Sequence, residues 1–292
     1  MRHALSLCFD ACRHPKTAAR FCATCVSLLA CLARAQAAAP LAAPADTIAV
    51  DVELVLAVDI SHSMDEKEFA LQRAGYVKAL RHADFINAVR SGVNGRIALA
   101  YFEWAGTVRD DAVIAWQVID DAESAAAFAD NIEARPFRSF RGTSISAALA
   151  FGAKLLDGAA FDATRSVIDI SGDGPNNIGM PVTMTRDAAI AKGIVINGLP
   201  ILISPSPSFS HLDQYYAECV TGGPGSFVLP VYAASEFVTA IRRKLVLEVS
   251  AVADPNAGPG AVPLDAAAPV DCLQGERGRR FFSDPYFPEL DR

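Results

Sequence analysis

The sequence predicts an α/β fold, doubly wound, in which a mainly parallel sheet carries helices on both faces. Between residues 51 and about 250, short apolar and β-branched runs alternate with longer amphipathic segments. The run 54–58 is apolar at every position, as expected for a strand that is buried on both faces. Strands that are separated by helices pair in parallel and carry helices on both sides of the sheet.

Six segments of this region have the composition of strands. The first, 54–58, ends at Asp59, and the second covers 97–102. The run 113–116 follows the second so closely that it indicates an antiparallel hairpin partner at an edge of the sheet. The remaining expected strands are 167–170, 194–203 and 227–229.

Amphipathic segments lie between these strands and predict helices. The last one places Phe237, Ile241 and Leu245 on one face, at the spacing of a helix that packs against a core. A helix at 144–157 is expected to begin directly after Gly142-Thr143. In chain order the expected helices are 65–81, 121–134, 144–157, 182–192, 211–220 and 234–248.

Residues 1–37 have the organisation of a secretory signal peptide. Basic residues precede the apolar run 21–33, and Ala35-Gln36-Ala37 matches an A-x-A cleavage site. The apolar run is shorter than the roughly 17 residues that a helix needs to cross a bilayer, which favours cleavage over a membrane anchor. Lipid attachment at Cys31, within an imperfect lipobox, is the lesser alternative. We therefore expect an exported protein, periplasmic or extracellular, with no transmembrane segment in the mature chain.

The rest of the chain divides into three parts. Residues 38–50 form an Ala/Pro-rich spacer, 51–250 the domain, and 251–292 a Pro/Gly/Ala-rich C-terminal tail. Loss of 1–37 removes five basic residues and one acidic residue, so the net charge changes from −7 to −11. A chain this acidic is not expected to bind nucleic acid through nonspecific attraction to phosphates.

The cysteines concentrate in the leader. Five of the seven lie within the first 31 residues, which leaves Cys219 and Cys272 in the mature chain. In an oxidising compartment, a lone pair of cysteines favours a disulfide over two free thiols. Cys219 and Cys272 are therefore the candidate disulfide.

Oxygen-bearing side chains gather at one edge of the expected sheet. Asp59, Ser61 and Ser63 follow the first strand at alternate positions, so their side chains point the same way. Thr143 lies at the start of a helix, and Asp173 leaves a central strand in a Gly-Asp-Gly turn. The carboxyl ends of parallel strands meet at one edge, where ligands bind. Hard oxygen donors without His or Cys predict Mg²⁺, with Mn²⁺ or Ca²⁺ as alternatives.

The composition of this donor set predicts what the cation does. Two carboxylates balance a divalent charge, and neutral hydroxyls leave the ion able to attract one more oxygen. We expect that oxygen to come from a protein partner that presents a carboxylate. Two simpler interpretations stay open: Asp59 and the serines as helix caps, and 172–177, including Asn176 and Asn177, as a turn. On these interpretations the domain is structural and its site is not functional.

The order Asp59-x-Ser61-x-Ser63, Thr143 and Asp173 within Ser-Gly-Asp-Gly resembles the metal ion-dependent adhesion site of von Willebrand factor type A (vWA) domains. The resemblance covers residues 50–248. It implies that the serines and the threonine contact the metal directly or nearly so, and that the two aspartates act mostly through water.

The resemblance also has implications for the sheet and for the branch of the superfamily. It implies a vWA/Rossmann-like sheet of six strands with one antiparallel edge strand, which corresponds to 108–117. The sequences of residues 171–177 and 219–225 resemble those of a bacterial secreted branch of the vWA superfamily. Adhesion domains often have glycine at the position of His62, whose side chain narrows the space above the ion.

An enzyme is the main functional alternative. The segment 172–177 resembles a late motif of haloacid dehalogenase phosphatases, which are metal-dependent phosphoesterases. Their chemistry needs a nucleophilic Asp followed two residues later by a second acid, and here Ser61 follows Asp59. A serine hydrolase would need a G-x-S-x-G elbow, which the sequence lacks. We therefore expect a binding protein rather than an enzyme.

Overall fold

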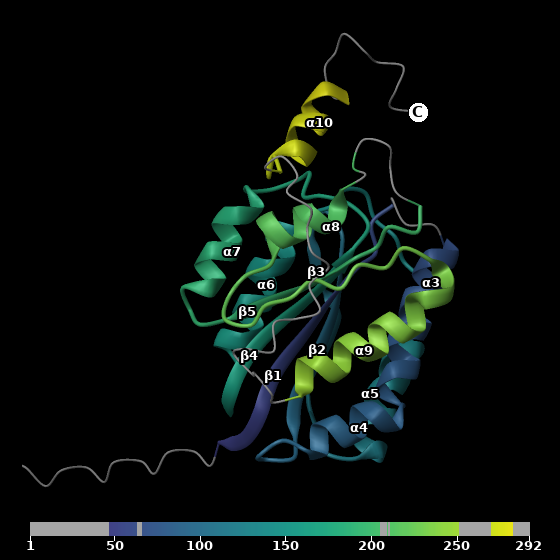
Figure 1. The fold of residues 1–292 in the computed structure, drawn as a ribbon, viewed down its shortest axis with the longest axis vertical. Coiled ribbons are helices and arrows are strands. Elements are labelled where there is room, and N and C mark those ends of the chain that lie inside the picture. The colour runs from purple at the N-terminus through teal and green to yellow at the C-terminus, as the bar shows by residue number, and fades with distance from the viewer. Residues whose placement is uncertain (1–46, 63–65, 205–208, 210, 251–269, 283–292) are drawn as a thin grey trace, which may run out of the picture. The chain divides into compact units, whose positions relative to one another are not determined.

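The computed structural model places a central sheet between two layers of helices (Figure 1). All described residues belong to one compact unit within residues 47–292. The predicted signal peptide, Ser63 and most of the expected tail lie outside the described residues. The residues that the structure describes are 47–62, 66–204, 209, 211–250 and 270–282.

The sheet has five strands in the order β3-β2-β1-β4-β5. The central strand β1 (Ile48–Asp59) pairs in parallel with β2 (Ile97–Trp104) and with β4 (Phe161–Gly172). Strand β5 (Val195–Pro200) continues the parallel arrangement beside β4. Strand β3 (Val108–Ile119) lies antiparallel to β2 at the edge. The predicted fold class, with its antiparallel edge strand, is confirmed.

The expected count of six strands is wrong, because the segment 227–229 forms no strand in the described part of the chain. It pairs with β5 at one isolated parallel bridge, and a second bridge joins the residues just beyond the ends of both segments. Between them lies Pro200, which has no backbone N–H and cannot donate to the carbonyl of Leu229. The missing hydrogen bond divides the ladder in two. The two bridges are Gly198–Val228 and Ile201–Val231.

Helices cover both faces of the sheet (Figure 1). Alternate residues of β1 serve the two layers: Leu54 and Leu56 pack into one core, Val55 and Ala57 into the other. The first layer consists of α3 (Glu66–Leu80), α4 (Ala83–Arg90), α5 (Ala122–Glu133) and α9 (Phe237–Val249). The second consists of α6 (Ile145–Asp157), α7 (Val182–Ile190), α8 (Leu212–Tyr215) and the π-helix η3 (Tyr216–Val220).

The expected helices are present, with ends shifted by a few residues. The segment 211–220 is divided between α8 and η3, and a 3₁₀ turn, η4 (Ala234–Glu236), precedes α9. Helix α4 is not expected from the sequence, because its eight residues span only about two turns. Its buried Phe85 and Val89 and its cap, in which His82 accepts from the Asp84 N–H, are visible only in the structure.

Two expected boundaries differ from the structure. Strand β1 begins at Ile48, within the expected spacer, because Ile48 and Val50 pair with β4. Within the expected tail, residues 270–282 are ordered and include α10 (Gln274–Phe282). The Cys219–Cys272 disulfide predicted from the sequence joins this segment to η3, with Cα atoms 5.5 Å apart.

Candidate functional site

Asp59 and Ser61 lie where β1 ends, in the loop that leads toward α3. The Ser61 N–H donates to Asp59 Oδ1 at 2.7 Å, which closes a tight turn between them. The loop is fastened to the segment before α6: the His62 N–H donates to Phe140 O at 2.9 Å, and the Phe140 N–H donates to Ile60 O at 3.2 Å. Asp59 and Ser61 are both buried. The positions of these two side chains are thus set by main-chain hydrogen bonds.

Thr143 lies directly before α6 and is buried. Gly142 precedes it with a φ of 85°, a left-handed conformation that glycine adopts without strain. Asn177 holds the Thr143 main chain from both sides. The Thr143 N–H donates to Asn177 Oδ1 at 2.9 Å, and the Asn177 N–H donates to Thr143 O at 2.8 Å. Thr143 is therefore tied to the loop that follows β4.

Asp173 begins that loop, and the glycine before it lets β4 approach the Asp59 carboxylate. A Cβ atom at Gly172 would lie 2.8 Å from Asp59 Oδ2 and 2.8 Å from the hydroxyl oxygen of Tyr216. Any side chain at this position would displace the carboxylate. The structure thus brings Asp59, Thr143 and Asp173 to one edge of the sheet, as the sequence predicts for parallel strands.

A cavity of about 420 Å³ opens at this edge. Ser61 and Thr143, two of the five predicted ligands, both line it. The exposed residues His62 and Arg141 lie beside them and bring one ionisable and one positively charged side chain to the rim. The full lining consists of Ser61, His62, Arg141, Gly142, Thr143 and Asn177.

The electrostatics of the site centre on Asp59. Burial raises the pKa of Asp59 well above its usual value, and the negative charge of Asp173 raises this pKa further. The hydrogen bond from the Ser61 N–H favours the charged form and opposes the shift. Asp59 Oδ2 is buried and has no hydrogen-bond partner among the described residues. Hydrogen bonds from the Ser61 side chain and the Asp173 main chain also lower the pKa of Asp59, but burial and the charge of Asp173 outweigh them.

The available donors fit a hard cation. Within the described residues, no three His, Cys, Asp or Glu side chains gather in a group that could hold a metal. What the edge offers instead is two hydroxyls, from Ser61 and Thr143, and the carboxylates of Asp59 and Asp173. Oxygen donors of this kind suit Mg²⁺, Mn²⁺ or Ca²⁺. Ser63, the fifth predicted ligand, lies outside the described residues.

Three residues of the site have roles that sequence reasoning missed. Asn176 and Asn177 are expected to be turn residues, yet Asn177 holds Thr143 and the buried Asn176 accepts from the Ser146 N–H at 2.9 Å. Tyr216 comes from the distant π-helix, and the charges of nearby Asp59 and Asp173 contribute to its raised pKa after burial. The Asn-Asn pair after Gly-Pro was a detectable signal, but no local pattern points to Tyr216.

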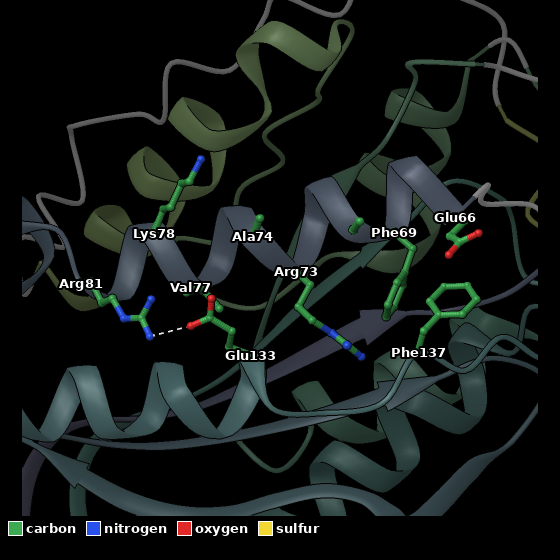
Figure 2. Close-up of a pocket in the computed structure, with 10 residues that line it drawn as sticks. Glu66, Phe69, Arg73, Ala74, Val77, Lys78, Arg81, Glu133 and Phe137 are labelled. Atoms are coloured by element: carbon green, nitrogen blue, oxygen red, sulfur yellow. Dashed lines mark hydrogen bonds and ion pairs between the residues drawn. The ribbon is translucent and has the colours of Figure 1, made fainter.

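A second groove, of about 350 Å³, lies between α3 and the end of α5 (Figure 2). At one end the Phe69 and Phe137 rings meet edge to face, with centroids 4.9 Å apart. At the other end Arg81 pairs with Glu133 at 2.7 Å, which Figure 2 shows as a dashed line. The residues that line it include two glutamates and no side chain with a hydroxyl group, so the combination of hydroxyls and carboxylates at the sheet edge is missing here. The groove is therefore not a candidate for the metal site.

A doubly wound sheet in this strand order, with one antiparallel edge strand, is a vWA-like fold. The fold is similar to that of proximal thread matrix protein 1 from the mussel byssus, at 14% identity and a TM-score of 0.50, covering 69% of this chain and 48% of that chain. It is also similar to the pilus adhesin SpaC from Lactobacillus rhamnosus GG, at 12% identity and a TM-score of 0.50, covering 70% and 31%.

A vWA structure from Catenulispora acidiphila matches at 15% identity and a TM-score of 0.49, covering 69% of this chain and 43% of that chain. The chain spans about a third to a half of the length of these structures. The chain belongs to the family described as "Protein of unknown function (DUF1194)", whose model matches residues 49–253. No curated protein matches the sequence. Among the described residues, none of the helices is long and apolar enough to cross a membrane.

Proposed function

We propose that this vWA-like domain is exported and holds a divalent cation, Mg²⁺ first and Mn²⁺ or Ca²⁺ as alternatives, with which it captures a carboxylate of a protein partner. The site belongs to a binding protein rather than an enzyme. The residues that we assign to the cation are Asp59, Ser61, Ser63, Thr143 and Asp173.

The buried Asp59 carboxylate is the observation that carries this proposal. Its Oδ2 atom has no hydrogen-bond partner among the described residues, and the charge of Asp173 adds to the cost of ionising it. Burying a charge is unfavourable unless it is paired or coordinates a metal. A divalent cation at this edge would attract both carboxylates and so offset the repulsion between them.

The surroundings of the cavity favour an anionic ligand. A cation bound there supplies a positive charge that two carboxylates only balance, and so it can accept one more oxygen. Arg141 lines the same cavity. Helix α6 begins directly after Thr143 and Ser144, and its amino-terminal end carries a partial positive charge. These features support a carboxylate on the partner.

Metal titration tests the first half of the proposal. Mn²⁺ or Mg²⁺ should raise the melting temperature of the wild-type protein and give a saturable calorimetric signal, because ligands that bind only the folded state stabilise it. Ser61→Ala and Asp173→Ala should lose both effects. Ser235→Ala and Asp162→Ala, which replace exposed residues outside the site, serve as matched controls. Equal stabilisation of the wild type and both site variants by metal would refute the proposal.

A pair of short peptides tests the second half. A peptide with one aspartate at its centre should bind the Mn²⁺-loaded protein and should not bind in chelator. The same peptide with asparagine in that place lacks only the charge and is the control. Equal binding of both peptides would show that the site does not select a carboxylate.

The same preparation tests the phosphoesterase alternative. Hydrolysis of a generic phosphate ester that is metal-dependent and lost in Asp59→Asn would replace the binding proposal with an enzymatic one. We expect no such hydrolysis, because Ser61 stands where the second acid would be needed.

Export and domain organisation are tested together. We propose that residues 1–37 are removed as a signal peptide, that 51–250 form the core of the domain and that 251–292 are a C-terminal extension. The mass of the protein recovered outside the cytoplasm should correspond to a chain that begins at Ala38. A chain that retains Met1 in that fraction would contradict the signal-peptide assignment.

A further inference from the structure

We infer that Glu276 is a positioning residue of the candidate metal site: it acts through Asn176 on the loop that orients Thr143. The segment that carries Glu276 is fastened in place by the Cys219–Cys272 disulfide. We call residues 270–278 the strap. The inference rests on the proposed function for its meaning, and its main test does not require that a metal binds.

The strap is attached to η3 at two points. The disulfide joins Cys272 to the fully buried Cys219. Two residues earlier, the Val270 N–H donates to Glu218 Oε2 at 3.0 Å. Helix α10 begins just after this attachment, so its first turn has a defined position on the domain.

The first turn of α10 lies directly on the loop that follows β4. Asn176 Nδ2 donates to Glu276 Oε1 at 2.7 Å. A Cβ atom at Gly275 would lie 2.1 Å from Asn176 O and 3.1 Å from Pro175 Cγ, so only glycine permits this approach. The strap thus contacts both the side chain and the main chain of Asn176.

Asn176 transmits this contact to the start of α6. Its side chain is fully buried, and its Oδ1 accepts from the Ser146 N–H at 2.9 Å. Its neighbour Asn177 holds the Thr143 main chain with hydrogen bonds of 2.9 and 2.8 Å. A continuous chain of hydrogen bonds and one peptide bond therefore runs from Glu276 to Thr143, which lines the cavity.

Removal of the Glu276 carboxylate should loosen this chain at one place. Asn176 Nδ2 would keep only its hydrogen bond to Met180 O, at 3.1 Å. The bond to Glu276 is the shorter of the two, 2.7 Å against 3.1 Å, so the lost bond is the stronger constraint. Residues that orient metal ligands from outside the ligand set affect metal affinity for this reason.

Amide hydrogen exchange of the protein in chelator tests the inference without any metal. In Glu276→Ala, exchange at Thr143, Ser146 and Asn177 should become about tenfold faster, because local opening becomes easier. Glu276→Gln keeps an oxygen that can accept from Asn176 and should exchange at about the wild-type rate. Unchanged exchange in Glu276→Ala, or equal acceleration in both variants, would overturn the inference.

Two glycines of α10 provide a second and independent test. Gly275→Ala places a methyl group against Asn176 and should accelerate exchange at the same three amides. Gly278→Ala gains the same helix propensity, but among the described residues its Cβ would meet only Phe209 Cζ, at 3.6 Å. Gly278→Ala should therefore behave like the wild type. If the two variants behave alike, the strap does not act through this contact.

Mn²⁺ titration then separates this inference from the proposed function. The affinity for Mn²⁺ should be about fivefold to tenfold lower than that of the wild type in Glu276→Ala and in Cys272→Ser, and little changed in Glu276→Gln. Failure of Mn²⁺ to bind the wild type would refute the proposed function, while the exchange result would still decide the positioning role. Binding that is lost in Ser61→Ala and unchanged in Glu276→Ala and Cys272→Ser would refute the positioning role alone.

Discussion

Two buried carboxylate sites in this domain differ in how their charge is balanced. In the layer between the sheet and α9, Lys244 Nζ lies 3.0 Å from Asp169 Oδ1 and 2.6 Å from Glu248 Oε1, and all three side chains are buried. At the carboxyl edge of the sheet, Asp59 is equally buried, but the described part of the chain provides no ion pair for it. One site contains its own cation, and the other does not.

The difference separates a structural charge from a functional one. Burial raises the pKa of Asp169 to about 7, and Lys244 opposes this rise. Burial also raises the pKa of Asp59, and here the charge of Asp173 adds to the rise. The chain thus retains, at the edge that opens into a cavity, a carboxylate that it does not neutralise. Strongly perturbed carboxylates in such places are typical of functional sites.

Removal of the internal cation should have the largest effect. Lys244→Met would leave Asp169 and Glu248 buried without a positive partner, and it should lower the free energy of unfolding by about 3–5 kcal/mol. Urea denaturation at neutral pH measures this loss. Arg243→Met, at an exposed position of the same helix, is the matched control and should change stability by less than about 0.5 kcal/mol. Similar losses in both variants would show that Lys244 does not neutralise a buried site.

A further buried carboxylate, Glu103, tests how much a cation from the chain stabilises a buried negative charge. Arg73 donates to it at 2.7 Å, and Figure 2 shows Arg73 within the groove beside α3. Arg73→Met should cost about 2 kcal/mol in urea denaturation, less than Lys244→Met, because Tyr101 still donates to Glu103 and Arg135 Nε still lies 3.6 Å from it. Lys78→Met, at an exposed position of α3, is the control. A loss no larger than that of the control would weaken the comparison.

Removal of the charge of Asp59 should have the opposite effect on stability. In chelator, Asp59→Asn should leave stability unchanged or raise it by about 1 kcal/mol, because an amide is less costly to bury than a charge. In saturating Mn²⁺ the same variant should be less stable than the wild type, because it loses the metal contribution. Thermal denaturation in the two conditions measures this reversal. Loss of stability in chelator would mean that the domain itself neutralises Asp59.

The pH dependence of Asp59 has a defined sign. Its folded pKa lies above the unfolded value of 3.8, so the folded protein binds the proton more tightly than the unfolded chain does. In chelator this group should lower stability as pH rises from about 4 through its folded pKa, and acidification should restore that stability. Urea denaturation across this range should show a flatter profile in Asp59→Asn. Above the folded pKa, Mn²⁺ should make the wild type more stable than Asp59→Asn. A wild-type stability that changes with neither pH nor Mn²⁺ would contradict the assignment.

An exposed ion pair should have the smallest effect. Arg81 pairs with Glu133 and Asp130 on the surface, at the far end of the groove in Figure 2 from Phe69 and Phe137. Arg81→Met should produce no measurable change in urea denaturation, because exposed ion pairs are screened by water and salt. A large change would show that burial is not what separates these charged sites.

Local patterns were sufficient to predict most elements. The uninterrupted apolar run of β1 indicates a strand with two buried faces, and the structure confirms that its alternate residues serve the two cores. The close spacing of β2 and β3 predicts an antiparallel edge, because a short connection excludes a crossover. The interrupted sixth strand was not predicted, since it depends on which β5 residue, here Pro200, stands opposite each residue of the neighbouring segment.

The candidate site was predictable as far as it depends on chain order. Asp59, Ser61, Thr143 and Asp173 follow strands or begin a helix, and parallel topology brings such positions to one edge. The contributions of Tyr216 and Glu276 were not predictable, because their contacts depend on how η3 and α10 pack against the loop after β4.

The sequence by itself determined the class of fold, the pairing of Cys219 with Cys272 and the oxygen-rich edge, because apolar periodicity, cysteine number and residue types at strand ends are local properties. Only the tertiary structure decided which buried carboxylates receive a cation from the chain. Lys244 lies 75 residues beyond Asp169, and no local pattern shows that they meet. The absence of an ion pair for Asp59 among the described residues is likewise a property of the packing and not of any segment of the chain.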